Sequence, residues 1–275
     1  MLSFSKYDRK PIYNIFLSGG DMFTFVSDLD HTLIYSHQKE GSCVEVLNGC
    51  GLTYMTPAAK QIFYRLLNQK DFLFIPCTAR NFQQTSRVEF IKKLPYMVCD
   101  LGGSVYVDGK PDYRWKTLLR KGGYIAPDAL EAEKMWVQKH LNSSYIKLHC
   151  NEDLFFVLSF KDRETAGYIF KKLKGRENGN IRYCLQGRKI YCIPVRLNKA
   201  NAVQYLMEQY HIENIHTSGD SLFDEEFTKI GTALLPAHAS IIHNTEYRTV
   251  ASGMQAGEEL IKQVEALYKK DIHPY

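Results

Sequence analysis

The stretch MFTFVSDLDHTL, residues 22–33, joins an apolar run to two closely spaced carboxylates. Residues 22–26 are aromatic and β-branched, which is typical of a buried strand in an α/β sheet. Asp28 and Asp30 follow at the carboxyl end of that strand, where ligands bind in open parallel sheets. Because the two acids are two residues apart, both side chains can reach a common centre. Such carboxylates repel each other, so we expect a hard divalent cation, most simply Mg²⁺, to lie between them.

Three other segments have the form of a strand followed by polar side chains. They are residues 72–80, which end in Thr78 and Arg80, residues 194–199, which reach Lys199 at the start of a helical pattern, and residues 215–224, which contain Asp220 and Asp224. A hydroxyl, a lysine and a second pair of acids are the groups needed to handle a phosphoryl group with a metal. Each has a structural alternative, because Lys199 could be a solvated helix lysine, Thr78 a helix cap and Asp224 an acid near a helix N-terminus.

The order of these motifs resembles the haloacid dehalogenase-like phosphohydrolases. The motifs are DxDxT, then Thr with a nearby Arg, then Lys at a helix start, then GDxxxD, and the resemblance runs from about Phe23 to the C-terminal helix. It implies an α/β fold in which a Rossmann-like parallel-sheet core carries an inserted α+β cap. It also implies Mg²⁺ as the cofactor.

The resemblance further implies a role for each matching residue. Asp28 would be the nucleophile that forms an aspartyl phosphate, and Asp30 the general acid and then the general base. The other implied catalytic groups are Thr78, which would bond a phosphoryl oxygen, and Lys199, which would offset the anionic charge. Thr32 and Arg80 would lie on the substrate side, with Thr32 orienting the Asp30 region. The implied metal site comprises Asp28, the backbone carbonyl of Asp30, Asp220, and Asp224 acting through Lys199 or a metal-bound water.

Two positions depart from the family pattern. His31 stands where these enzymes very often have glycine, inside the nucleophile loop. Phe223 stands where relatives often carry asparagine, just before the second acid of the last motif. Neither departure removes a catalytic carboxylate, so we expect the chemistry to be retained.

The chain is expected to divide into a core, residues 1–113 and 194–275, and an inserted cap, residues 114–193. Within the core, we expect residues 36–53 to form a loop over the nucleophile, and a helix to place Val88, Ile91 and Leu94 on its inner face. The cap pattern of helices and antiparallel hairpins resembles the larger cap of the Cof-type, sucrose-phosphate and trehalose-phosphate phosphatases. Candidate substrate contacts lie at the tip of a cap hairpin, where a solvated turn is the alternative: Gln186, Arg188 and Lys189.

Composition narrows the class of protein. The chain has 275 residues and a formal net charge of +5 with interspersed charges, which suits a small anionic substrate better than nucleic acid. Its seven cysteines show no CxxC spacing, which favours reduced thiols in the cytoplasm. Since no apolar run approaches ~20 residues, we expect no membrane span. We expect a monomer or homodimer.

The sequence therefore predicts a Mg²⁺-dependent phosphatase that acts on a small phosphorylated metabolite, most simply a sugar phosphate. One alternative is a phosphomutase of the same superfamily, which would isomerise a sugar phosphate without releasing phosphate. Another is a non-catalytic protein that keeps the fold and binds or senses a phosphate ligand. The intact acids argue against the second alternative, because paired carboxylates are costly unless they bind a metal.

Overall fold

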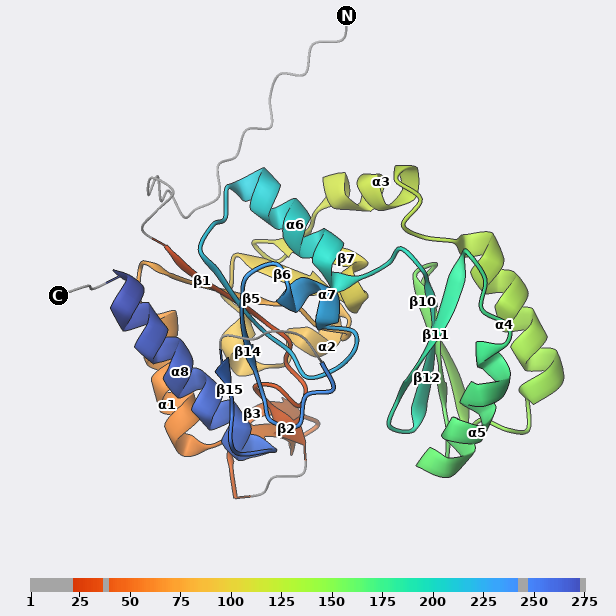
Figure 1. Ribbon diagram of the computed structural model, residues 1–275, viewed down its shortest axis with the longest axis horizontal. Coiled ribbons are helices and arrows are strands. Elements are labelled where there is room, and N and C mark those ends of the chain that lie inside the picture. Colours follow the sequence, from red (N-terminus) through yellow and green to blue (C-terminus); the bar gives the residue numbers. More distant parts are fainter. Residues whose placement is uncertain (1–21, 37–39, 242–246, 273–275) are drawn as a thin grey trace, which may run out of the picture.

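The centre of the molecule is a sheet of five parallel strands in the order β15-β14-β13-β1-β5 (Figure 1). The structure, a computed structural model, describes residues 22–36, 40–241 and 247–272. The strands span Phe23–Ser27 (β1), Phe72–Pro76 (β5), Ile215–Ser218 (β13), Thr232–Leu235 (β14) and Tyr247–Arg248 (β15). A bridge from Cys77 to Val98 continues this sheet into the antiparallel strands β6 (Tyr96–Cys99), β7 (Ser104–Val107) and β8 (Lys110–Pro111). The expected parallel α/β core is confirmed.

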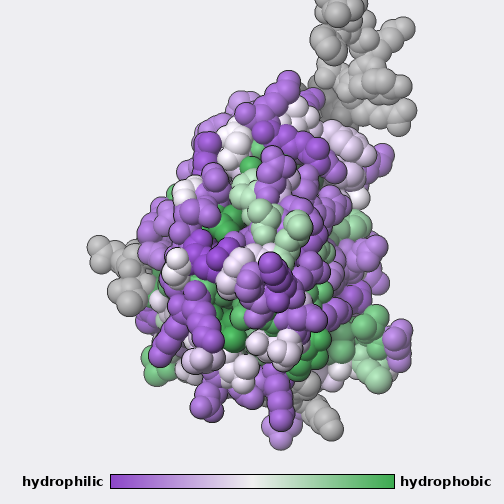
Figure 2. Space-filling model, turned by 90° about the vertical axis from the view of Figure 1, so that its right-hand side faces the viewer, coloured by the Kyte–Doolittle hydropathy of each residue, from purple (hydrophilic) through white to green (hydrophobic). Residues whose placement is uncertain are grey.

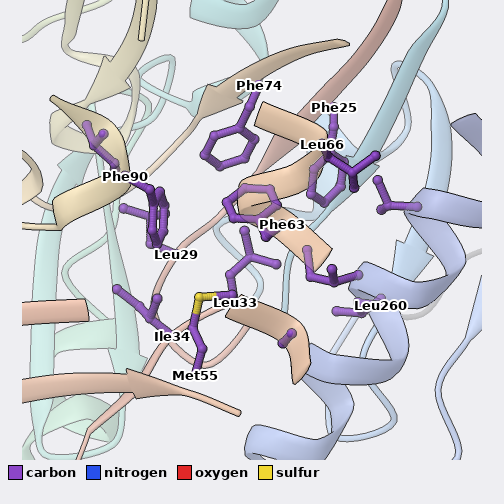
Figure 3. Close-up of a cluster of buried hydrophobic side chains, with 14 of the residues drawn as sticks. Phe25, Leu29, Leu33, Ile34, Met55, Phe63, Leu66, Phe74, Phe90 and Leu260 are labelled. Atoms are coloured by element: carbon purple, nitrogen blue, oxygen red, sulfur yellow. The ribbon is translucent and has the colours of Figure 1, made fainter. Parts of the chain in front are cut away.

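Helices cover both faces of this sheet. Phe23 and Phe25 of β1 pack into a cluster with α1 (Pro57–Leu67) and α8 (Met254–Ile272), whereas Val26 packs with α6 (Lys199–Tyr210) on the opposite face. This follows from the strand geometry, in which successive side chains point to opposite faces. In the first cluster, Phe25, Phe63 and Leu260 approach one another from the sheet and the two helices (Figure 3). The buried sheet thereby gives the loops at its edge a rigid support.

Residues 36–53 were expected to form a loop over the nucleophile. Most of this segment instead belongs to a β-hairpin, so the predicted loop conformation was wrong. Strands β3 (Ser42–Leu47) and β4 (Cys50–Met55) pair antiparallel, and β4 also pairs with β2 (Tyr35–Ser36). We call residues 42–55 the flap hairpin. Its turn is Asn48-Gly49, with φ of +51° and +77°. Both angles are left-handed, as the tight turn between twisted strands requires. Residues 37–39 of the expected loop lie outside the described residues.

Two further expectations on the core need correction. In place of one helix carrying Val88 and Ile91, the chain forms a short helix α2 (Phe82–Thr85) and a 3₁₀ turn (Glu89–Ile91). Residues 195–197 form no strand, because the chain there crosses from the cap to α6. The apolar side chains are still buried at Val88 and Ile91, so the segment packs as expected with a different backbone.

The cap is a four-stranded antiparallel sheet, β11-β12-β10-β9, beside the core (Figure 1). Its elements are α4 (Pro127–Leu141), β9 (Lys147–Asn151), β10 (Phe155–Ser159), α5 (Arg163–Lys174), β11 (Ile181–Gln186) and β12 (Lys189–Pro194). The preceding helix α3 (Tyr113–Lys121) packs on the core through Trp115, whose indole N–H donates to the carbonyl of Gly102. One face of this sheet packs on α4 and α5, and the other face packs toward the core. The surface on the cap side is mostly hydrophilic, with smaller apolar groups between (Figure 2). The expected α+β cap is confirmed.

Residues on both sides of the expected insertion lie beside α6. Asp112 precedes α3, and its carboxylate accepts a hydrogen bond of 2.8 Å from the hydroxyl of Tyr205 on α6. The side chain of Asn198 accepts from the backbone N–H of Asn201 and so caps the same helix. Among the helices in the described part of the chain, none combines the length and apolarity that crossing a bilayer demands.

Candidate active site

The nucleophile loop is anchored by its apolar residues. Leu29 and Leu33 are almost fully buried in the cluster between β1, α1 and α8 (Figure 3). The carbonyl oxygen of Leu29 accepts hydrogen bonds from three backbone N–H groups, those of residues 32, 33 and 34. His31 has φ of +61°, a left-handed conformation that glycine adopts without the strain that a side chain brings. The His31 side chain is exposed, and its backbone oxygen lies 2.8 Å from Nε2 of His238.

A buried lysine joins two of the acids. Nζ of Lys199 donates hydrogen bonds of 2.6 Å to Asp28 and 2.6 Å to Asp224, and the Lys199 side chain is only 2% exposed. Burial alone would lower the pKa of Lys199, but the charges of Asp224 and Asp28 raise it above its ordinary value. Lys199 is therefore a charged, buried group of the site, and the solvated-lysine alternative is wrong.

Asp224 is fully occupied by protein donors. One carboxylate oxygen accepts from Lys199, and the other accepts from the backbone N–H groups of Asp220 and Ser221 and from the Ser221 hydroxyl. The side chain is completely buried and does not cap the short helix α7 (Glu225–Thr228). Asp224 thus holds both Lys199 and the loop that carries Asp220.

Asp28, Asp220 and Asp224 together form a crowded anionic centre. Oxygens of Asp28, Asp220 and Asp224 lie within 4.8 Å of one another. Burial raises the pKa of Asp28 to about 7, against the lowering effect of Lys199. Burial, together with the charges of Asp28 and Asp224, raises the pKa of Asp220 to about 8. A single lysine does not balance three carboxylates, and hard carboxylate oxygens suit Mg²⁺, so the donor set fits a divalent cation held by Asp28 and Asp220.

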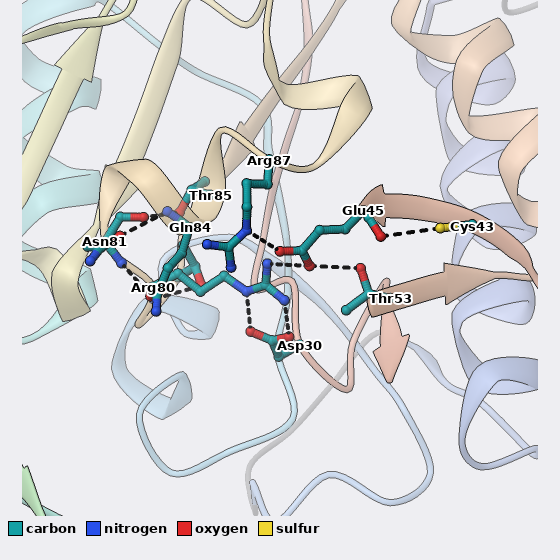
Figure 4. Close-up of polar contacts among 10 residues, drawn as sticks. Asp30, Cys43, Glu45, Thr53, Arg80, Asn81, Gln84, Thr85 and Arg87 are labelled. Atoms are coloured by element: carbon teal, nitrogen blue, oxygen red, sulfur yellow. Dashed lines mark hydrogen bonds and ion pairs between the residues drawn. The ribbon is translucent and has the colours of Figure 1, made fainter. Parts of the chain in front are cut away.

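Asp30 points away from this centre. Its carboxylate accepts two hydrogen bonds from the guanidinium of Arg80, 2.7 Å from Nε and 2.6 Å from Nη2 (Figure 4). Its side chain is 43% exposed, in contrast to that of Asp28. The two acids of the first motif therefore occupy different environments, one buried beside a lysine and the other at the surface of the site beside an arginine.

The two expected hydroxyls lie at the same edge of the sheet. Thr78 is buried directly after β5, and its Oγ1 accepts a hydrogen bond from the backbone N–H of Arg80. Thr78 caps no helix, because the cap of α2 is Asn81. Thr32 donates to Asp220 at 3.4 Å and so contacts the metal-site acid rather than Asp30.

The three cap residues lie at the turn between β11 and β12. Lys189 and Arg188 are exposed, and Gln186 is half-buried. Strand alternation places Lys189 on the same face as Tyr191, because Ile190 between them is buried among the cap helices. Arg188 donates to the carbonyl of Lys161 within the cap itself.

Sequence reasoning missed Tyr191 and Glu45. Tyr191 is buried on the core-facing side of the cap sheet, with its ring centroid 5.0 Å from that of Phe223 on the core. Phe223, which stands in place of the usual asparagine, therefore serves a contact between cap and core. Glu45 lies on the flap hairpin and pairs with Arg80 at 2.8 Å. The Asn48-Gly49 turn signal between two β-branched runs could have revealed that hairpin.

Comparison with known proteins places this geometry in a family. Residues 22–234 match the family model described as sucrose-6F-phosphate phosphohydrolase. The chain belongs to this family. It is accordingly a haloacid dehalogenase-type phosphoric monoester hydrolase of the subgroup with a large α+β cap. In a comparison with curated protein sequences, the chain finds no match.

Solved structures show the same fold at low sequence identity. A sucrose-phosphatase from Synechocystis in complex with sucrose and phosphate is 17% identical, with a TM-score of 0.62 over 89% of this chain and 98% of that one. A HAD/COF-like hydrolase from Plasmodium vivax is 15% identical, with a TM-score of 0.63 over 91% and 98%. A protein from Thermoplasma acidophilum is 16% identical, with a TM-score of 0.61 over 89% and 98%. The fold thus covers nearly the full length of each of these relatives.

Proposed function

We propose that this chain is a Mg²⁺-dependent phosphatase that hydrolyses a sugar phosphate through an aspartyl-phosphate intermediate. The observation that carries the proposal is the pairing of the buried Lys199 with Asp28, beside Asp220. Three carboxylates, of which Asp28 and Asp224 are buried and Asp220 is half-buried, keep an excess of negative charge beside one lysine, which a divalent cation offsets. The family match supports the phosphatase class of the reaction.

The chain's own residues supply the steps of the reaction. An oxygen of Asp28 attacks the phosphorus, and Asp30 gives its proton to the leaving oxygen, so an alcohol departs and Asp28 carries the phosphoryl group. Asp30, now a carboxylate, takes a proton from water as that water attacks the phosphorus. Phosphate leaves, and Asp28 and Asp30 return to their starting states. Bound Mg²⁺ would offset the charge of the phosphoryl oxygens.

Three groups assist without forming bonds to phosphorus. Lys199 neutralises charge beside the nucleophile, and its hydrogen bond to Asp224 keeps it in place. Thr78 lies directly beyond β5, where its hydroxyl can donate to a phosphoryl oxygen. These roles depend on fixed positions, which the buried sheet beneath the loops supplies.

We propose that the cap, residues 114–193, reads the alcohol part of the substrate. A sugar is the class of alcohol that the family favours, and one solved relative is a sucrose-phosphatase in complex with sucrose and phosphate. Gln186 and Lys189 pair across the cap hairpin, and Lys189 shares the core-facing side of the sheet with Tyr191. A polar pair beside an aromatic ring suits a hydroxyl-rich ligand, because the polar groups bond hydroxyls and the ring covers apolar C–H groups.

The test is release of inorganic phosphate from a panel of sugar phosphates, with and without Mg²⁺, beside Asp28→Asn as the control. We expect Mg²⁺-dependent release that the variant lacks. Isomerised sugar phosphate without free phosphate would instead identify a phosphomutase. If a folded protein that binds Mg²⁺ turned over no ester at all, the binding or regulatory alternative would replace the proposal.

A further inference from the structure

We infer that Glu45, on the flap hairpin, is a positioning residue for proton transfer by Asp30, acting through Arg80. The inference rests on the proposed function, because it assigns Glu45 to the acid step of that reaction. Glu45 is a buried carboxylate with no part in the expected chemistry, and it lies between two arginines (Figure 4).

Every contact of the Glu45 carboxylate is to a group that holds it still. The residue is 1% exposed. One oxygen accepts from Nη1 of Arg80 at 2.8 Å and from the Thr53 hydroxyl at 3.0 Å. The other oxygen accepts from Nε of Arg87 at 2.9 Å. Burial of a charge at this depth is costly unless it is paired and hydrogen-bonded in this manner.

The backbone of Glu45 is fixed from two sides. It pairs with Thr53 on β4, and it forms an antiparallel bridge with Val88 on the other side. The register of the hairpin shifts on both sides of Glu45, which marks a β-bulge. Bulges re-aim a side chain, and here Val44 and Glu45 are both buried although they are adjacent along the strand. The hairpin thus directs a carboxylate at Arg80.

Arg80 transmits this position to Asp30. The guanidinium of Arg80 is planar and rigid. When Glu45 holds Nη1, it therefore also fixes the direction in which the edge formed by Nε and Nη2 points. That second edge bonds both oxygens of Asp30 at 2.7 Å and 2.6 Å. The Asp30 side chain is 43% exposed and that of Arg80 is 13% exposed, so the position of Asp30 depends on the support that Arg80 receives from the protein. Glu45 supplies this support.

The net charge of the network depends on the proton of Asp30. Arg80 and Arg87 face Asp30 and Glu45, so the four side chains carry no net charge when Asp30 acts as the base, and one positive charge when Asp30 holds the proton that it gives as the acid. Without the charge of Glu45, Arg80 keeps Asp30 as its carboxylate partner, and Arg87 loses the carboxylate that it bonds. Arg80 would then hold Asp30 in a geometry set by the substrate and solvent rather than by the hairpin. Transfer of the proton to the leaving oxygen, which needs a defined donor position, should suffer most.

The test compares two esters that differ in their need for that proton. 4-Nitrophenyl phosphate has a leaving group that is stable as an anion, whereas benzyl phosphate has an alkoxide leaving group that must be protonated. We would measure kcat/KM, which reports the steps up to departure of the leaving group, for both esters on the same preparation of Glu45→Gln. We expect the ratio of benzyl to nitrophenyl kcat/KM to fall about 10-fold or more, since general acid catalysis supplies about 10²–10⁴-fold.

The matched control is Glu89→Gln, which removes a glutamate charge from the exposed ion pair with Lys60. This variant should leave the ratio unchanged. Because the ratio is taken within one preparation, partial unfolding of Glu45→Gln cancels. An equal loss for both esters, or no loss, would overturn the role of Glu45 and leave the phosphatase intact. Release of phosphate by the wild type neither from these esters nor from any sugar phosphate of the panel would overturn the proposed function and this role together.

Discussion

In the absence of a divalent metal, the free energy of unfolding of the protein should fall as the pH rises. The folded state raises the pKa of Asp28 to about 7 and of Asp220 to about 8, above the ordinary value of 3.8. Between about pH 4 and pH 8, the folded state therefore keeps protons that the unfolded chain has released. Stability falls wherever the folded state binds more protons than the unfolded state. The loss should accumulate across this range and level off above about pH 8.

The size of this effect follows from the number of protons retained. Each retained proton costs about 1.4 kcal/mol of unfolding free energy per pH unit. Since a change of 1 kcal/mol shifts Tm by about 2–4 °C in a chain of this size, one proton gives a fall of about 3–6 °C per pH unit, and the two protons held by Asp28 and Asp220 give about twice that between pH 5 and pH 6. Mg²⁺ binds the ionised acids, so it should flatten this slope and raise Tm more at pH 8 than at pH 5.5.

The assay is thermal unfolding followed from pH 5 to pH 9, once with a chelator and once with millimolar Mg²⁺. Asp220→Asn is the control, because it removes one of the two retained protons and should reduce the slope in the chelator. The reasoning is refuted if Tm rises with pH in the chelator, or if the slope is the same with Mg²⁺ and without it.

Other variants test the supports of the site. Lys199→Met leaves its two aspartate partners buried without a counter-charge, so urea unfolding should show a loss of about 3–5 kcal/mol and phosphate release should stop; a loss below 1 kcal/mol would contradict this. Gly102→Ala places a Cβ 2.2 Å from a backbone oxygen at φ of +91°, and should cost more stability than Gly49→Ala, which is left-handed at +77° but meets no atom within 4 Å. Equal unfolding free energies would refute the steric argument. Tyr191→Ala removes the ring that packs on Phe223, so KM for the best sugar phosphate should rise several-fold with little change in kcat; a change in kcat alone would count against it.

Much of the site could be predicted because Asp28, Thr78 and Asp220 follow the ends of strands, whereas Lys199 reaches Asp28 from the start of α6. The carboxyl ends of the parallel strands β1, β5 and β13 place those three residues at one edge of the sheet. The arrangement follows from the topology alone, since the carboxyl ends of neighbouring parallel strands meet.

The contacts that depend on side-chain direction could not be predicted in this way. Glu45 reaches Arg80 only because a bulge turns it inward, and a bulge has no clear mark in one sequence. The side of β12 that faces the core could not be predicted from the sequence either. Both Ile190 and Tyr191 are buried there, because the cap sheet is covered on both faces, so alternation of polarity gives no direction. The hairpin turn at Asn48-Gly49 was readable in principle and was overlooked.

The hydrogen bond between Asp112 and Tyr205 has a consequence for how such enzymes diverge. Asp112 and Asn198, on the two sides of the expected insertion, both bond α6, so one helix holds both ends of that segment. We propose that a segment of different length or fold could be joined at these two ends without moving the loops that hold the reacting groups. Selection can therefore exchange the part that reads the alcohol while the phosphate chemistry stays constant, and a designer can graft a foreign cap at the same two ends.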